Sequence, residues 1–167
     1  AGTPPASIMA PTIDCSATSF SGANQTNINN HIASRACLAN CGTPGNDACP
    51  NATVLACGDK FSSSTENASA SGAPNGCGAG GAPNAGVWFR FTGTGDIVTV
   101  STQNSSFDTQ LNLYSGACGS LTCLDGDDDS GPGLTSELTF CSSPGVSYFV
   151  YLDGFGGATG FYAIDIA

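Results

Sequence analysis

Short apolar runs separated by turn-forming clusters dominate the chain from Asn46 onward. Within most runs apolar and polar residues alternate, which is the pattern of a β-strand with one buried face. Clusters of Gly, Asn, Asp and Pro separate the runs at intervals of roughly 8–15 residues. We expect strands at residues 52–56, 61–70, 87–91, 97–101, 109–114, 136–140, 146–152 and 161–166. This spacing predicts an all-β fold, a jelly-roll-like antiparallel β-sandwich of about 8–9 strands.

Residues 1–45 do not share this pattern, and we predict that they form an N-terminal arm or extension ahead of a β-sandwich domain at 46–167. The arm begins with a Pro-rich segment typical of a mature N-terminus left by signal-peptide cleavage. A short helix is expected over about residues 27–40, where Ile28 and Ile32 fall near one side.

The charge of the chain is low in total and strongly acidic in sign. Thirteen acidic residues against three basic ones give a formal net charge of −10, and charged residues make up only 10% of the chain. This excludes nucleic acid as a partner, because phosphate contacts need Lys and Arg. Anionic membrane surfaces are equally unfavourable, and no run approaches the ~20 apolar residues of a membrane span. Such a composition suits calcium binding or simple solubility.

Nine cysteines indicate an oxidising compartment and therefore disulfides. The sequence does not define their connectivity, but we expect Cys49 to pair with Cys77 and Cys57 with Cys141, since both bonds could link sheet edges. Because nine is odd, at least one thiol is free or joins another chain. The arm holds the three candidates for assembly or for a free thiol, which are Cys15, Cys37 and Cys41.

Four Asn-x-Ser/Thr motifs mark candidate glycosylation sites at Asn24, Asn51, Asn67 and Asn104. Together with the cysteines, they predict a secreted glycoprotein located outside the cell or on its surface.

The order of several segments resembles a known family. These segments are NDACPNA from Asn46, GVWFRFTGTG from Gly86, FDTQLNLYSGACGSLTC from Phe107, DGDDD from Asp125, GVSYFVYLDGFG from Gly145 and GFYAIDI from Gly160. Together they are similar to the secreted β-sandwich modules related to the bacterial pre-peptidase C-terminal domain, which recur in surface proteins of bacteria and microalgae. The resemblance covers residues 46–167 and implies a jelly-roll-like sandwich, a disulfide between Cys118 and Cys123, and often Ca²⁺ near the acidic segment.

The chain departs from the pattern of this family in its cysteines. Gln103 stands where many relatives carry a Cys, Ser130 replaces another after the acidic run, and Cys141 is an addition. The disulfide arrangement of the family therefore cannot be transferred as a whole. The modules serve as accessory, adhesive and structural parts, so the resemblance is a poor guide to function.

The acidic run is the strongest candidate site. Asp125, Asp127, Asp128 and Asp129 lie within five residues, and Asp108 could reach the same end of a sandwich. So many carboxylates repel one another unless they are solvated or bridged by a cation. Because Ca²⁺ takes about six to eight oxygen ligands from flexible loops, we predict a Ca²⁺ site formed by these five residues. A solvated acidic turn is the alternative.

The aromatic residues allow a second kind of site. Trp88, Tyr114, Tyr148, Tyr151 and Phe155 could stack on sugar rings, as aromatic residues do in carbohydrate-binding modules. They could equally fill the second face of a two-sheet core or an interface, which is the interpretation we favour. Glycans therefore stay candidate partners.

We expect no enzymatic activity. His31 is the only histidine, and a Ser-His-Asp or Cys-His device would need it in a preorganised cleft. A glycosidase would need a carboxylate pair such as Asp108 with Asp127 or Asp128, and turn carboxylates or calcium ligands explain these residues better.

The predicted function is that of a non-catalytic extracellular structural glycoprotein subunit. It would assemble head-to-tail into a filament or a surface or matrix structure through its N-terminal arm, with itself as partner. The alternative is a carbohydrate-binding or accessory module of a secreted protein.

Overall fold

The computed structural model describes residues 42–70, 72–75, 77–79 and 82–167, and Gly42–Ala167 forms one compact unit. The helix expected at 27–40 lies outside the described residues, as do Cys15, Cys37, Cys41, Asn24 and His31. No helical segment in the described part has the length and apolar character needed to cross a membrane.

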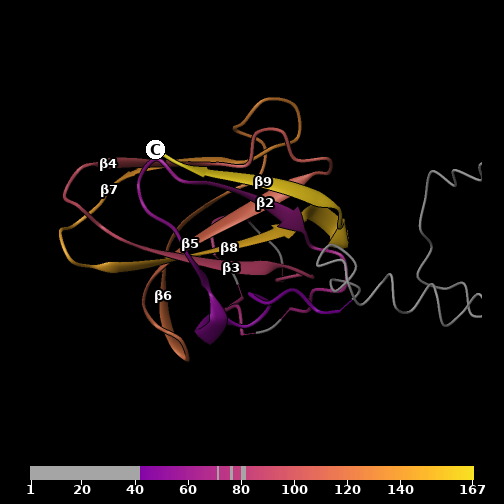
Figure 1. Cartoon of the computed structure of the whole chain (residues 1–167), viewed down its shortest axis with the longest axis horizontal. Helices are drawn as coiled ribbons and strands as arrows, with labels where there is room; N and C mark the ends of the chain where they lie inside the picture. Colours follow the sequence, from indigo (N-terminus) through magenta and orange to yellow (C-terminus); the bar gives the residue numbers. More distant parts are fainter. Residues whose placement is uncertain (1–41, 71, 76, 80–81) are drawn as a thin grey trace, which may run out of the picture. The chain divides into compact units, whose positions relative to one another are not determined.

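Two β-sheets pack face to face in a sandwich (Figure 1). The five-stranded sheet has the order β1 (Thr53–Val54), β3 (Val87–Thr92), β8 (Ser147–Gly154), β5 (Thr109–Ala117) and β6 (Ser120–Asp127). The four-stranded sheet has the order β2 (Lys60–Ser64), β9 (Phe161–Ile166), β4 (Ile97–Ser101) and β7 (Glu137–Cys141). The expected all-β sandwich is thus confirmed, with nine strands among the described residues. Neighbouring strands are antiparallel except β1 and β3, which run parallel.

The core between the sheets takes alternate residues from each strand. From β3 it takes Val87, Phe89 and Phe91, and from β5 it takes Leu111 and Leu113, as the alternation predicts. Each such side chain, fully buried, stabilises the fold by about 1.5–3 kcal/mol.

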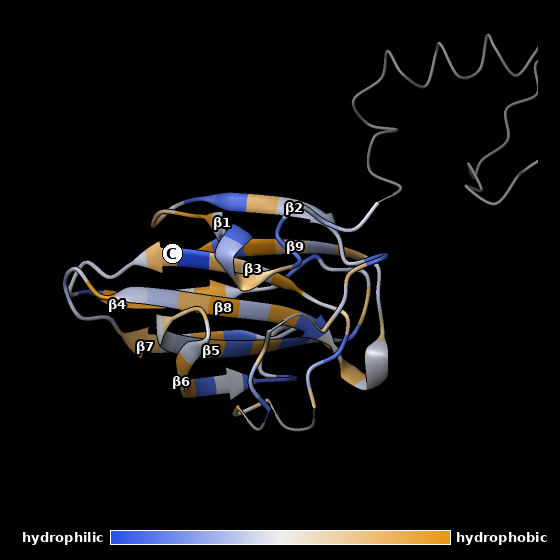
Figure 2. Ribbon diagram, turned by 90° about the horizontal axis from the view of Figure 1, so that it is seen from below, coloured by the Kyte–Doolittle hydropathy of each residue, from blue (hydrophilic) through white to orange (hydrophobic). Residues whose placement is uncertain are grey.

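A second apolar cluster lies on the outer face of the five-stranded sheet. Trp88, Tyr114 and Tyr151 point to this face and are fully buried there. The 3-10 helix η2 (Cys49–Asn51) and the segment around Cys77 contribute buried residues to the same cluster. Figure 2 shows the hydrophobic colouring of β8, the central strand of this sheet. Its apolar run is almost continuous because both of its faces are covered.

The disulfides differ from those expected, for a reason that lies in the strand ladder. Cys49 bonds to Cys118, and Cys77 bonds to Cys123. A Cys118–Cys123 bond is impossible here, because Cys123 pairs across the ladder with Tyr114 and is therefore three strand rows or more from Cys118. That separation is about 10 Å, beyond the ~7 Å limit of a disulfide. Each cysteine bonds instead to a segment that covers the outer face of the sheet.

The expected Cys57–Cys141 bond is also wrong, and both thiols are free and exposed. Cys57 lies beside β2 and Cys141 ends β7, and these strands form opposite edges of the four-stranded sheet. With strands about 4.8 Å apart, the two cysteines are separated by about 10–14 Å and cannot bond to each other.

Candidate metal centre

Asp108 is positioned by the start of β5. The next residue, Thr109, is buried, and its hydroxyl lies 2.6 Å from the Thr102 hydroxyl and 3.2 Å from the Ser136 hydroxyl. Asp108 is also tied through its main chain, because the Phe155 N–H donates to its carbonyl at 3.1 Å. The 3-10 helix η3 (Phe155–Gly157) therefore lies directly beside Asp108.

Asp127 shapes the turn that carries Asp128 and Asp129. Its carboxylate accepts hydrogen bonds from the Ser130 N–H at 3.1 Å and the Glu137 N–H at 2.8 Å, and from the Ser130 hydroxyl. These bonds occupy both oxygens of Asp127 and fix the chain between β6 and β7. Asp127 is thus a turn-forming residue in this structure.

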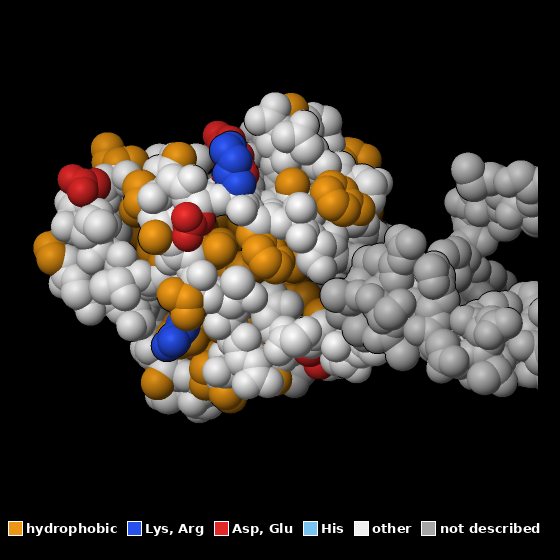
Figure 3. All heavy atoms as spheres, viewed as in Figure 1, with side chains coloured by type: hydrophobic (Ala, Val, Ile, Leu, Met, Phe, Trp, Pro, Cys, Tyr) orange, Lys and Arg blue, Asp and Glu red, His pale blue; other side chains and the backbone are white. Residues whose placement is uncertain are grey.

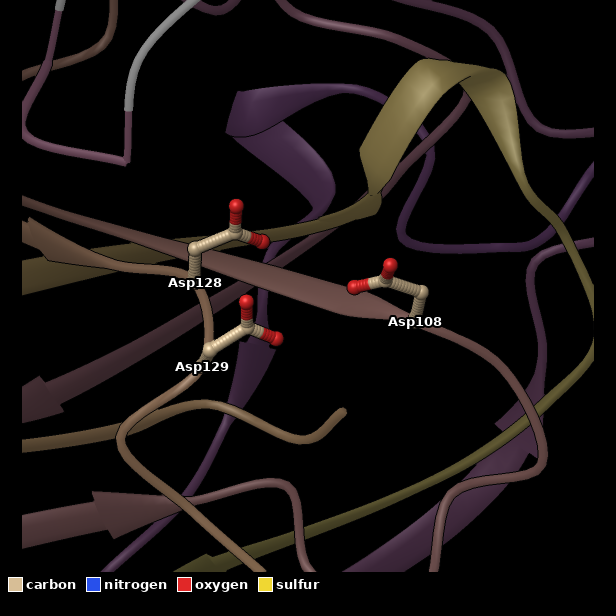
Figure 4. A group of neighbouring side chains, drawn as sticks. All are labelled: Asp108, Asp128 and Asp129. Atoms are coloured by element: carbon tan, nitrogen blue, oxygen red, sulfur yellow. The ribbon is translucent and has the colours of Figure 1, made fainter. Parts of the chain in front are cut away.

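Three carboxylates converge at this end of the sandwich. One oxygen from each of Asp108, Asp128 and Asp129 lies within 4.8 Å of the other two. Figure 4 shows the three carboxylates facing a common space, with Asp108 opposite the other two. Oδ1 of Asp108 and Oδ1 of Asp128 are buried and have no hydrogen-bond partner. The arrangement is therefore one of mutual repulsion unless protons or a cation offset it.

The electrostatics of the group follow from this crowding. Desolvation raises the pKa of Asp108, and the charge of Asp129 raises it further. Desolvation also raises the pKa of Asp128, with added repulsion from Asp129 and Asp108, while a hydrogen bond from Gln110 lowers it. Both carboxyl groups therefore hold a proton more readily than ordinary aspartates do.

A fourth carboxylate, Asp153, lies behind the group at the end of β8. It is only 1% exposed, and its Oδ2 accepts a hydrogen bond from the Asn84 N–H at 2.7 Å. Its Oδ1 is buried and has no hydrogen-bond partner. In the β5–β8 ladder Asp153 pairs with Gln110, whose side-chain amide donates to the Ala79 carbonyl at 3.1 Å. Asp153 is coupled to the three converging carboxylates through charge, because desolvation raises the pKa of Asp153 and the charge of Asp128 raises it further.

The structure brings together three of the five predicted ligands and leaves two outside the group. Asp108, Asp128 and Asp129 lie together, whereas Asp127 is engaged in the turn and Asp125 accepts a hydrogen bond from the N–H of Gly126. Asp153 is the residue that sequence reasoning missed. One signal in the sequence could have identified it. Asp153 directly follows the apolar run 146–152, so a charged residue lies at the end of a strand that is expected to be buried.

The other predicted sites are distributed over the surface and the core. Asn51, Asn67 and Asn104 are exposed, and the last two have positive φ angles of 61° and 77°. Four of the five aromatic residues weighed as sugar-stacking groups are buried and pack in the two clusters, and these are Trp88, Tyr114, Tyr148 and Tyr151. Phe155 alone of the five is exposed, at 57%.

Comparisons with known proteins find a likeness in structure and none in sequence profile. No protein-family profile matches the chain, and no curated protein matches it significantly. Among solved structures, the chain is similar to the pre-peptidase C-terminal domain of collagenase from Bacillus anthracis, with a TM-score of 0.47 and 13% sequence identity. The match covers 70% of this chain and 94% of that chain. That domain is of the family that the sequence motifs resemble.

The two disulfides join positions 69 and 46 residues apart in the sequence. Bonds of this kind persist in oxidising environments, so the structure indicates an oxidising compartment.

Proposed function

We propose that this chain is a non-catalytic extracellular module that binds Ca²⁺ and serves as a structural subunit of an extracellular assembly. The observation that carries the cation is that the buried, unpaired Oδ1 atoms of Asp108 and Asp128 belong to a group of three converging carboxylates with Asp129. A buried oxygen without a donor is costly, and a cation removes that cost for several oxygens at once.

The donor set favours Ca²⁺ over other metals. The converging ligands are carboxylate oxygens, without the imidazole or thiolate that Zn²⁺ and other transition metals prefer. Asp129 is exposed, so water can complete the shell from the solvent side. Ca²⁺ accepts such mixed and irregular shells, whereas Mg²⁺ demands near-ideal octahedral geometry. Asp108, Asp128 and Asp129 would hold the ion, with Asp153 adding negative charge behind them.

Calorimetric titration of the full chain with Ca²⁺, after treatment with a chelator, tests this site. We expect heat of binding and a Ca²⁺-dependent rise in Tm, because a ligand that binds only the folded state stabilises it. Asp128→Asn removes one ligand and should weaken binding at least about tenfold. It should also raise the Tm of the metal-free protein by relieving repulsion.

Glu66→Gln is the matched control, because it removes one exposed negative charge outside the carboxylate group. It should leave both the Ca²⁺ affinity and the Tm shift unchanged. If the wild-type chain shows neither heat of binding nor a Tm shift, the Ca²⁺ site is excluded. If the two substitutions change Ca²⁺ affinity equally, the effect of Ca²⁺ is general charge screening and not binding at this site.

The structural role is supported by the surface and by the arm. Figure 3 shows a face dominated by uncharged atoms, with charged side chains scattered over it. Charged residues are 10% of the chain, so neighbouring copies meet little electrostatic repulsion outside the acidic group. We propose that the arm joins copies head-to-tail and that exposed Asn51, Asn67 and Asn104 carry glycans. Electron microscopy of native material should show polymers, and single particles of one chain would contradict this role.

A glycan-binding role is the second candidate, and Phe155 is the observation that favours it. Its ring is exposed, and its main chain bonds directly to Asp108 of the carboxylate group. An aromatic ring beside a cation can stack on a sugar whose hydroxyl groups complete the metal shell. A glycan array with and without Ca²⁺ tests this role, and binding should disappear in Phe155→Ala.

A further inference from the structure

Two unpaired thiols lie at one end of the four-stranded sheet. Cys141 ends β7, and its partner across the ladder is Ile97, the first residue of β4. Cys57 lies directly before Gly58, whose N–H donates to the Ile166 carbonyl at the end of β9. Because the strands are antiparallel, these positions share one end, which we call the thiol end. Figure 1 shows the C-terminus at this end.

Neither thiol forms a disulfide within the described part of the chain. Both are exposed, and the width of the sheet prevents them from bonding to each other. The two sandwich disulfides use four of the nine cysteines, which leaves these two and the three before Gly42. In an oxidising compartment, exposed surplus thiols are the natural positions for bonds to other segments or other chains.

The chain enters the sandwich at the opposite end. The Asn46 carbonyl accepts a hydrogen bond from the Trp88 N–H at 2.8 Å, beside the start of β3. The start of β3 pairs with the end of β8, next to Asp153 and the carboxylate group. We call this the acidic end. Residues 1–41 precede this point in the sequence, and their contour length of at most about 140 Å is ample to reach a second molecule.

The thiol end also exposes an apolar side chain beside one of the thiols. Ile97, beside Cys141, is 66% exposed, which leaves an apolar residue at the thiol end without cover. Lys60 opens β2 at this end, where its ammonium forms an ion pair with Asp165, and Arg90 lies in the second half of β3. These are the two basic residues of the described part of the chain.

We propose that the thiol end docks the arm of a second copy of this chain, and that arm cysteines form disulfides there with Cys57 and Cys141. β7 is an edge strand of its sheet, so the incoming segment can add to it by main-chain hydrogen bonds while Cys141 closes the contact covalently. The head-to-tail direction follows from the opposite placement of the thiols and the point where the arm departs. This inference rests on the structural role proposed above and names the contact that performs it.

The covalent step is ordinary thiol–disulfide exchange. A thiolate of Cys57 or Cys141 attacks a small oxidised disulfide such as oxidised glutathione and forms a mixed disulfide, releasing one reduced thiol. The arm thiolate then attacks the Cys57 or Cys141 sulfur of this mixed disulfide, which forms the bond between the two copies and releases the second glutathione as a thiol. Two protein thiols are thus oxidised to one disulfide while one glutathione disulfide is reduced to two thiols.

Isotope mixing distinguishes bonds between copies from bonds within one copy. Equal amounts of ¹⁴N- and ¹⁵N-labelled full chain, reduced and then oxidised together with glutathione disulfide, are digested without reduction and analysed by mass spectrometry. We expect peptides that join Cys57 or Cys141 to an arm cysteine, with about half of them carrying one light and one heavy partner. The Cys49–Cys118 and Cys77–Cys123 peptides serve as internal controls, because in folded copies their two halves must carry the same label.

Two results would overturn the inference. In the first, every disulfide-linked peptide of Cys57 and Cys141 carries the same isotope label on both halves. In the second, both thiols remain free and react with an alkylating reagent. Light scattering and microscopy of the same sample separate this failure from failure of the structural role. If polymers form while both thiols stay free, the thiol end is not the contact and the structural role survives. If no polymer forms under any condition, the structural role itself fails. The double variant Cys57→Ser with Cys141→Ser should lose covalent oligomers on non-reducing gels and keep its Ca²⁺-dependent Tm shift.

Discussion

Asp153 is the one buried carboxylate among the described residues. Desolvation raises the pKa of Asp153 to about 6 against the hydrogen bonds that lower it, and the charge of Asp128 adds to the rise. The pKa values of Asp108 and Asp128 are raised as well. The metal-free folded protein therefore retains protons at a pH where the unfolded chain has already released them.

The free energy of unfolding of the metal-free protein should fall as the pH rises from about 4 to about 7. An aspartate of the unfolded chain titrates near pH 3.9, so the folded state binds more protons between that value and about 6 and is favoured at the acid side of the window. Asp153→Asn keeps an acceptor for the Asn84 N–H and should flatten the dependence by on the order of 2–3 kcal/mol. Urea unfolding at a series of pH values in chelator measures it. Identical pH profiles of wild type and variant would contradict this account.

At the scale of elements, the strands that the sequence predicts well are those with one buried face. β4 and β9 begin and end where the pattern places them, because Val98 and Val100, and Ile164 and Ile166, alternate with exposed residues. β6 was not predicted, since it is an edge strand with mostly exposed side chains and carries no alternation of burial. Because the pattern predicts no strand there, the whole acidic run is expected to be one loop, and nothing in the sequence separates Asp127 from the other aspartates.

Gly126 shows how β6 is held, and its replacement should destabilise the fold. A Cβ at Gly126 would lie 2.3 Å from the Ala79 nitrogen, because the backbone of residues 78–79 runs directly against the strand. We expect Gly126→Ala to lower the free energy of unfolding by about 1–3 kcal/mol, the usual cost of overpacking. Gly45→Ala is the matched control, since a Cβ there meets nothing within 4 Å. Urea denaturation compares the two, and equal stabilities would show that the close contact is absent.

At the scale of the whole molecule, the chain builds two apolar clusters and covers the second with segments that have little regular structure. The segment around Cys77 and helix η2 reach the outer face of the five-stranded sheet, and disulfides hold both in place. Sequence reasoning located the apolar strands but not these covers, because a Gly- and Ala-rich segment has no pattern that tells which face it will cover. The disulfide partners depend on that placement and could not be predicted without it.

The two disulfides should therefore carry a large share of the stability, while the two free thiols carry none. Opening Cys49–Cys118 by the double change to Ser releases a loop of 69 residues in the unfolded state, and the chain-entropy relation gives a loss of about 4 kcal/mol. Cys57→Ser with Cys141→Ser is the matched control, since both side chains are exposed and unpaired, and it should change stability by less than about 0.5 kcal/mol. Urea unfolding of the monomeric fraction of each protein, with Ca²⁺ held constant, measures the difference. Equal losses in the two double variants would mean that Cys57 and Cys141 are bonded within the chain and that the pairing described here is wrong.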